Sequence, residues 1–213
     1  MDEGARAPRV GVVSGRIPTV DFEAARRVLG VDERMRVIPS NDVVRGFLFK
    51  MTEDALARAG RGAVEAFRRE IKPRSRWAFR PYPVREYIEE AAVAAAILSP
   101  DDPVDALRTV WRETHRYAPL FNAERFIALL GVDVLAAVRW LEQQRKTFAS
   151  FGTWRLEERG PGYVVMHYFG EWVWIESAHR GGMEGVLQAC GRQGTVDVVL
   201  DTPFDGHLHV RWR

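Results

Sequence analysis

Apolar side chains recur every three or four positions through most of residues 20–150, which is the spacing of helices with one buried face. Capping residues and prolines stand where several of these runs begin, as Asp21, Pro83 and Asp133 show. The predicted helices cover residues 21–29, 41–60, 63–71, 83–98, 103–114, 122–130 and 133–141. A short strand is expected before them at 10–13. The first two thirds of the chain therefore read as helical.

The period changes near Phe151 to one that favours strands. A loop and a helix are expected at 177–190, where Gly181, Gly185 and Ala189 lie four positions apart. That spacing gives the helix a face without large side chains, which predicts that its backbone approaches a sheet closely. Before this helix, the predicted strands cover residues 153–158, 163–169 and 172–175.

The last two strands are expected to form a hairpin around a loop at 202–206. One register places apolar pairs on one face and complementary polar pairs on the other, as a half-buried sheet requires. The apolar pairs are Leu200 with Leu208, Val198 with Val210, and Val196 with Trp212. The opposite face pairs Asp201 with His207, Val199 with His209, and Asp197 with Arg211.

Helices first and strands last predict an α+β fold, with a helical half, a small antiparallel sheet and a Gly-rich helix inserted before the final hairpin. We expect residues 1–40 to form an N-terminal extension with one short helix, and residues 41–213 to form a single domain. Within that domain, 41–150 is the helical part and 151–213 is the sheet with its helix.

Composition narrows the class of protein. One cysteine among 213 residues excludes an internal disulfide and favours a reducing compartment. The longest apolar run, 91–98, is far shorter than the ~20 residues of a membrane span. No signal-peptide pattern opens the chain. These features predict a soluble cytoplasmic protein.

Aromatic side chains concentrate in the predicted sheet, where the strand at 163–169 is apolar on both faces except for His167. A sheet covered on one side needs only one apolar face, so something else must cover the second. Another helix of the chain, a second copy in a homodimer, or an apolar ligand each satisfies this need. The candidate ligand- or partner-binding residues are Trp154, Tyr168, Trp172 and Trp174.

A basic segment at 67–86 contains interleaved aromatic residues, a combination that can hold phosphates and stack bases. A solvated loop with its aromatic residues anchored in the core is the favoured alternative. The sequence pI of 8.9 also falls short of the value above ~9 that is typical of nucleic-acid binders. The candidate anion-binding residues are Arg74, Arg76, Arg80 and Tyr82.

Catalytic and metal-binding patterns are weak. His207, His209 and Asp201 could hold a metal, but the expected hairpin already gives His207 a carboxylate partner, and zinc takes three or four ligands. Cys190 reads as a small core residue on the apolar side of its helix. No nucleophile elbow, phosphate-binding loop or zinc-protease motif is present. An enzyme is therefore disfavoured, and no cofactor is expected.

Several short motifs, taken in order, resemble an uncharacterised paralogous family of myxobacteria over roughly residues 41–213. They are Val44-Arg45-Gly46-Phe47-Leu48-Phe49, Pro81-Tyr82-Pro83-Val84-Arg85-Glu86-Tyr87, Gly131-Val132-Asp133, Met183-Glu184-Gly185-Val186-Leu187 with Gly191, and the closing alternation to Trp212. That family distantly resembles the superfamily of heme-nitric-oxide-binding domains, vinyl-reductase-type domains and small TRAPP subunits. The resemblance implies a pocket for a small molecule or an acyl chain between helices and sheet, or a dimeric scaffold.

The resemblance does not extend to heme. The heme-binding members carry a Tyr-x-Ser-x-Arg motif, and no tyrosine of this chain begins one. His115 could be considered as an axial ligand only by disregarding that difference.

Three functional hypotheses follow. The leading one is a non-enzymatic signalling or scaffold module, homodimeric, that binds an apolar small molecule or a protein partner. The alternatives are a nucleic-acid or phosphate-binding module that uses the segment 67–86, and a metal-dependent enzyme that uses His207, His209 and Asp201.

Overall fold

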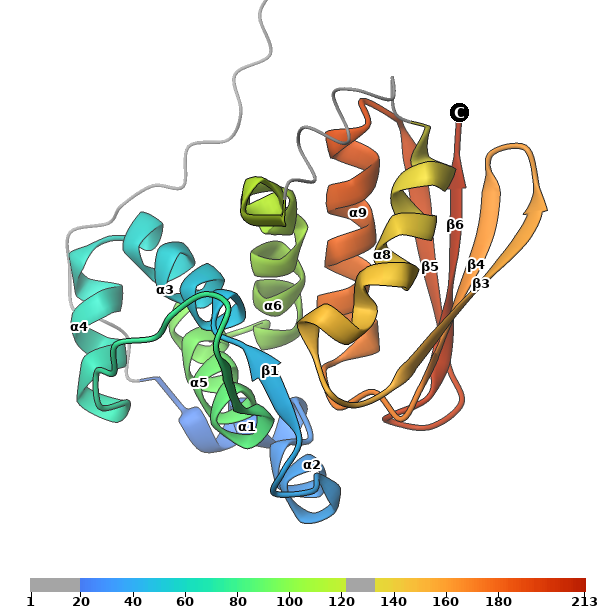
Figure 1. Cartoon of the computed structure of the whole chain (residues 1–213). Helices are drawn as coiled ribbons and strands as arrows, with labels where there is room; N and C mark the ends of the chain where they lie inside the picture. The colour runs from blue at the N-terminus through green and yellow to red at the C-terminus, as the bar shows by residue number, and fades with distance from the viewer. Residues whose placement is uncertain (1–19, 122–132) are drawn as a thin grey trace, which may run out of the picture.

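A computed structural model describes residues 20–121 and 133–213. Its elements form layers, from a helical half on one side, through α8 and α9, to a sheet on the other side (Figure 1). The helical half contains α1 Phe22–Val28, α2 Val31–Val37, α3 Phe47–Ala59, α4 Arg61–Glu70, α5 Val84–Leu98, α6 Pro103–Arg112 and the 3-10 helix η1 Glu113–Phe121, with short strands β1 Val43–Arg45 and β2 Pro81–Pro83. The second half contains α8 Val134–Phe148, β3 Thr153–Gly160, β4 Tyr163–Phe169, the π-helix η2 Ile175–His179, α9 Arg180–Ala189, β5 Gly194–Leu200 and β6 Gly206–Trp212.

This arrangement confirms the predicted α+β fold class, with helices first and an antiparallel sheet last. The helix expected at 122–130 and the strand expected at 10–13 lie outside the described residues. In the described part of the chain, no helix has the length and hydropathy needed to cross a membrane.

The segment before residue 41 contains two helices where the sequence pattern predicted one. Asp21 caps α1 as expected, accepting from the backbone N–H of Ala24 at 2.9 Å. Gly30 then adopts a left-handed conformation (φ 60°), which turns the chain directly into α2. Leu29 and Val31 are buried in the core of the helical half, so this segment is packed against the following residues. The predicted domain boundary at residue 40 stays a prediction.

The helix expected at 41–60 begins only at Phe47, because β1 pairs with β2 just before it. The backbone N–H of Gly46 donates to the carbonyl of Arg80 at 3.0 Å. A side chain at Gly46 would meet the carbonyl oxygen of Trp77 at 2.3 Å, so only glycine permits this close approach. The helix was predicted to include β1 because its residues also fit a helical period. The strand that pairs with β1 lies about 38 residues further along the chain, as Val44 and Tyr82 show, so the local pattern does not reveal it.

The four-stranded sheet has the order β3-β4-β6-β5, with all neighbours antiparallel. The predicted hairpin exists, but its register was wrong by two residues: Val196 faces Val210, and Gly206 faces Leu200. The shift is even, so every side chain keeps its predicted face. The reason lies in the loop, where Thr202 Oγ1 accepts from the N–H of Asp205 at 3.0 Å and closes a compact turn before Gly206.

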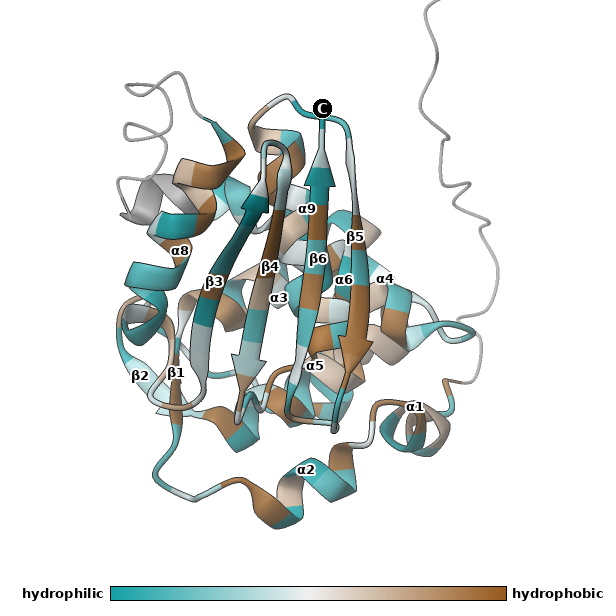
Figure 2. Cartoon of the chain, turned by 90° about the vertical axis from the view of Figure 1, so that its right-hand side faces the viewer, coloured by the Kyte–Doolittle hydropathy of each residue, from teal (hydrophilic) through white to brown (hydrophobic). Residues whose placement is uncertain are grey.

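One face of this sheet packs on α8 and α9, with Val164, Met166 and Tyr168 of β4 fully buried there. The opposite face carries no other element of the described chain and is turned toward the viewer in Figure 2. Its side chains are mixed rather than apolar, since His207, His209 and charged residues alternate along β6 and β5. The sequence of β4 alone suggested a second apolar face, but the polar side chains of the neighbouring strands make this face of the sheet mixed.

The segment expected as a strand at 172–175 is a loop that leads into η2, so that prediction was wrong. Its apolar side chains pack in the core of the helical half, where Val173 and Trp174 are buried. The small face of α9 also packs differently from the expectation. A side chain at Gly181 or Gly185 would meet backbone carbonyl oxygens of α6 at 2.1 and 2.2 Å, respectively, so this face contacts a helix, and the apolar side of α9 faces the sheet.

Candidate ligand-binding cavity

A cavity of about 140 Å³ lies between the helical half and the sheet. It is bounded by α3, α6, α8, α9 and the inner face of β3 and β4. Aromatic and aliphatic side chains form most of its wall, among them Trp111, Trp140, Phe148, Met183 and Val186. Such a wall is typical of small-molecule sites, where apolar surface provides affinity and a few polar groups provide orientation.

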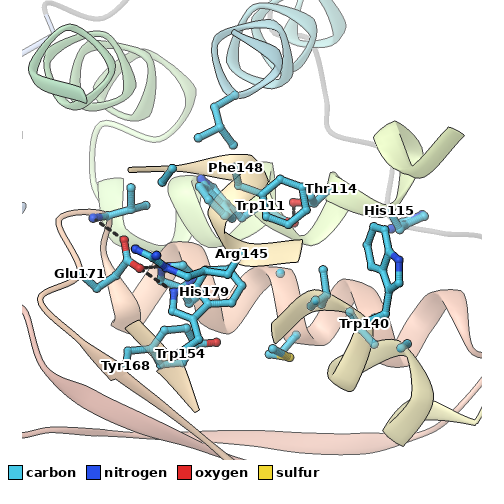
Figure 3. Close-up of a pocket in the computed structure, with 18 of the residues that line it drawn as sticks. Trp111, Thr114, His115, Trp140, Arg145, Phe148, Trp154, Tyr168, Glu171 and His179 are labelled. Atoms are coloured by element: carbon cyan, nitrogen blue, oxygen red, sulfur yellow. Dashed lines mark hydrogen bonds and ion pairs between the residues drawn. The ribbon is translucent and has the colours of Figure 1, made fainter. Parts of the chain in front are cut away.

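Polar side chains gather at one end of this cavity, away from Trp140 and His115 (Figure 3). Glu171 is at their centre. Its Oε2 accepts from Trp154 Nε1 at 2.7 Å, and its Oε1 accepts from the backbone N–H of Val173 at 3.3 Å. His179 Nε2 lies 3.5 Å from Oε2, without the geometry of a hydrogen bond. The Glu171 carboxylate is thus held by donors on both oxygens.

Three side chains at this end have buried polar atoms without a hydrogen-bond partner: the Tyr168 hydroxyl, Arg145 Nε and Nη2, and His179 Nε2. The Tyr168 ring packs on the His179 ring with centroids 4.5 Å apart. Burial raises the pKa of Tyr168 well above its ordinary value, so the hydroxyl stays protonated. Burial also lowers the pKa of Arg145, against the opposing influence of Glu171 and Asp42. Buried polar groups are normally hydrogen-bonded, so several exceptions in one cavity mark a candidate binding site.

The structure separates the four predicted aromatic residues into two pairs. Trp154 and Tyr168 line the cavity and contact each other edge to face, with ring centroids 5.4 Å apart. Trp174 is fully buried in the helical core, where its Nε1 donates to the Leu29 carbonyl at 2.7 Å. Trp172 Nε1 donates to Asp42 Oδ2 at 2.7 Å and does not line the cavity.

Comparison with known proteins identifies the family of the chain. The model of the family described as "Protein of unknown function (DUF2378)" matches residues 37–213. The chain belongs to this family. No curated protein matches the DUF2378 chain in sequence.

Solved H-NOX structures share the fold of this DUF2378 protein. The Fe(II) unliganded H-NOX protein from K. algicida is 14% identical, with a TM-score of 0.62 over 79% of this chain and 96% of that one. A point mutant of T. tengcongensis H-NOX is 12% identical, with a TM-score of 0.64 over 79% and 97%. The H-NOX from Shewanella woodyi is 13% identical, with a TM-score of 0.60 over 78% and 93%. The expected resemblance to heme-nitric-oxide-binding domains is confirmed at the level of fold.

The residues around the cavity of the DUF2378 chain do not fit a heme. Its volume of about 140 Å³ is below the ~300–1,000 Å³ of sites for drug-sized ligands, and a porphyrin needs at least that range. Trp140 and Phe148 pack edge to face within it, with centroids 6.4 Å apart. His115 lines the cavity and its Nδ1 contacts the Arg112 carbonyl at 3.0 Å, which leaves Nε2 free, so the mismatch with heme rests on the cavity's size and aromatic packing and not on this histidine. The missing Tyr-x-Ser-x-Arg motif agrees with this mismatch.

Two arginines of the basic segment of the DUF2378 chain are held in ion pairs. Arg76 is buried, pairs with Glu90 at 2.5 Å, and stacks its guanidinium over Phe49 at 3.8 Å. Arg74 pairs with Glu86 at 2.6 Å. Arg80 is exposed, whereas the Tyr82 hydroxyl accepts from the backbone N–H of Trp77 at 2.8 Å. Arg74 and Arg76 share Glu86 as an ion-pair partner, and the Arg76 guanidinium lies 5.7 Å from the Tyr82 ring centroid, so the structure brings these three predicted residues together with both arginines already paired to carboxylates.

The histidines of the last hairpin have separate partners. His207 Nδ1 lies 4.0 Å from Asp201 Oδ2, and His209 Nδ1 lies 2.7 Å from the Tyr163 hydroxyl. Within residues 20–121 and 133–213, no group of three or more His, Cys, Asp or Glu side chains could hold a metal ion.

Sequence reasoning missed Arg145, Glu171 and His179. The sequence pattern could have indicated Arg145. It lies on the same face of α8 as the buried residues Val134 and Val138, so it places a charged side chain on an otherwise apolar, buried face. Glu171 and His179 follow no comparable pattern, because only the folded chain brings them together.

Proposed function

We propose that this chain is a small-molecule-binding signalling domain whose ligand lies in the cavity between the helical half and the sheet. The observation that carries the proposal is a largely apolar cavity with, at one end, three side chains that have buried polar atoms without a hydrogen-bond partner. The shared fold supports it, since the similar H-NOX structure from Shewanella woodyi was solved with IWP-051 bound and in the Fe(II)CO ligation state.

The position of the cavity suits a sensor. Trp111 and Val173 belong to the core of the helical half, whereas Met183 and Tyr168 belong to the core beneath the sheet, and all four line the cavity. A ligand there contacts both cores, so its binding free energy depends on how the two halves are arranged. Differential contact of this kind is what allows a ligand to shift a conformational equilibrium.

The thiol of Cys190 at the cavity is poorly suited to nucleophilic catalysis, which agrees with a binding function. Cys190 lines the wall, but burial raises the pKa of its thiol. Nucleophilic catalysis needs the thiolate, which a raised pKa disfavours at neutral pH.

The ligand's apolar part is small. A dry, engineered protein cavity of about 150 Å³ accommodates benzene, so about 140 Å³ suits one aromatic ring or a short alkyl chain. With roughly 7 non-hydrogen atoms at about 1 kcal/mol each, the binding free energy is about 7 kcal/mol, which corresponds to a Kd of roughly 10 μM.

Toluene is a suitable probe, because Trp111, Trp140 and Trp154 line the cavity and report through their fluorescence. We expect saturable binding to the purified protein. Ala136→Phe places a ring inside the cavity and should abolish it, whereas Ala57→Phe on the exposed face of α3 should leave it unchanged. Equal toluene binding by wild type and Ala136→Phe, or none by the folded wild type, contradicts the proposal.

A protein partner on the open face of the sheet is a second candidate, in line with the expected homodimer. Phe169 and Val199 are 44% and 41% exposed on that face. Sedimentation of the wild type and of a Phe169→Ser, Val199→Ser variant tests it: a dimer that the double substitution dissociates supports this candidate, and a monomeric wild type removes the homodimer.

The single cysteine supports a cytoplasmic location.

A further inference from the structure

We propose that the cavity binds a small apolar monocarboxylate, with its carboxylate on the guanidinium of Arg145 and the hydroxyl of Tyr168. This inference rests on the proposed function and names its ligand class. Arg145 lies in the last turn of α8 and is only 8% exposed. Its side chain lines the polar end of the cavity beside Tyr168, Glu171 and His179 (Figure 3).

Arg145 lacks the partner that a buried arginine needs. Its Nε and Nη2 atoms are inaccessible to solvent and make no hydrogen bond. A guanidinium is always charged and only donates, so an acceptor must come from elsewhere. Leaving a buried donor unsatisfied is unfavourable, and more so for a charged group, so a ligand that satisfies it recovers that free energy on binding.

Neither neighbouring carboxylate fills this role. The Glu171 carboxylate accepts from Trp154 Nε1 and from the N–H of Val173, but the Arg145 Nε and Nη2 atoms form no hydrogen bond with it. Both oxygens of Asp42 accept as well, Oδ2 from Trp172 Nε1 at 2.7 Å and Oδ1 from Ser150 Oγ at 3.1 Å. These two groups attenuate the positive charge of Arg145 through space without bonding to it.

The chemistry of the remaining donors selects the ligand's polar group. A carboxylate offers two acceptor oxygens in a plane, which match the fork of an arginine. The Tyr168 hydroxyl is protonated and can donate to the same group. The rest of the cavity is apolar and has room for about one ring, so a benzoate-like acid is the simplest molecule that matches both ends.

Isothermal titration at pH 7 with benzoate and nitrobenzene tests this inference, because the two probes have nearly the same shape and differ in charge. Hydrogen bonds to a charged group contribute about 1.5–3 kcal/mol, so we expect benzoate to bind about 10- to 100-fold more tightly. Arg145→Met should remove that preference and leave nitrobenzene binding within about threefold. Arg139→Met, on the exposed face of the same helix, is the matched control and should behave as wild type.

Tyr168→Phe deletes the hydroxyl at constant ring volume and should weaken benzoate binding about 3- to 10-fold, which provides a second test if Arg145→Met does not fold. Nitrobenzene binding as tight as benzoate binding in the wild type overturns the carboxylate inference while the proposed function stands. Failure of benzoate, nitrobenzene and toluene alike overturns both.

Discussion

Glycine at position 185 is required by the contact between α9 and α6. A side chain there would lie 2.2 Å from the carbonyl oxygen of Arg112 and 3.0 Å from its carbonyl carbon. Both are backbone atoms of α6, so no change of rotamer can relieve the overlap. Gly185→Ala therefore forces the two helices apart by about 1 Å, given ordinary carbon–oxygen contacts of about 3.3 Å.

The expected loss of stability follows from two opposing effects. Overpacking costs about 1–3 kcal/mol, and the upper end applies where rigid backbone meets the new methyl group. Replacing a helical glycine by alanine recovers about 1 kcal/mol of helix propensity. The net loss is about 2 kcal/mol, which for a chain of this size lowers Tm by about 4–8 °C.

Gly182→Ala is the matched control, since it is the same substitution on another side of the same helix. Its side chain would lie 3.7 Å from Trp111 Cε3, which is ordinary contact. Propensity alone then raises stability by up to about 1 kcal/mol. Urea unfolding of both variants, followed by circular dichroism, should separate them by about 3 kcal/mol. If Gly185→Ala is as stable as Gly182→Ala, the close packing of α9 on α6 is refuted.

Two ion pairs give further predictions. Glu90→Gln removes the main partner of buried Arg76 and should lower the free energy of unfolding by about 3 kcal/mol in urea titrations, and an unchanged urea midpoint would disprove the buried pair. Burial raises the pKa of Glu184, but hydrogen bonds from Arg108 and Arg112 outweigh that effect and hold the pKa below its ordinary value of 4.5. This stabilisation is complete above pH 4.5 and is lost as the pH falls through the lower, folded-state value. The stability difference between wild type and Glu184→Gln should therefore shrink in acid, and a gap that stays constant from neutral pH to pH 3 would count against the pair.

The final hairpin shows how much local sequence determines. Alternation alone places Val196, Leu208 and Val210 on the buried face, and the structure confirms this. The exact partners depend on the loop, where the Asp201 N–H bonds to the Asp205 carbonyl at 3.0 Å. That bond makes the loop end one residue earlier than expected, and the register moves by two. The face on which a strand residue lies depends on the alternation of the strand's own sequence, whereas the register of the hairpin depends on the turn.

Long-range packing explains the other differences. Val44 reads as helical from its neighbours, yet it lies in β1 because β2 is available to pair with it. Trp174 reads as part of a strand, but its indole is buried against Leu29 at the start of the chain. In each case the deciding partner is distant in sequence, so local periodicity could not supply it.

Only part of the candidate site could be predicted from the sequence, for the same reason. Trp154 and Tyr168 stand out by aromatic density, and the structure places both on the cavity wall. Glu171 lies in a loop just before the segment that was predicted as a strand at 172–175, and His179 lies in a π-helix where a loop and a helix were expected. Only the fold brings them beside Arg145.

The central claim is that a small molecule binds between the helical half and the sheet. Intermolecular nuclear Overhauser effects from toluene to methyl-labelled protein test it most directly. The account predicts contacts from the ring protons to the methyl groups of Met183 and Val186, which line the cavity. Contacts confined to Val199 on the open face of the sheet, or saturating toluene without contacts to the cavity methyl groups, would contradict it.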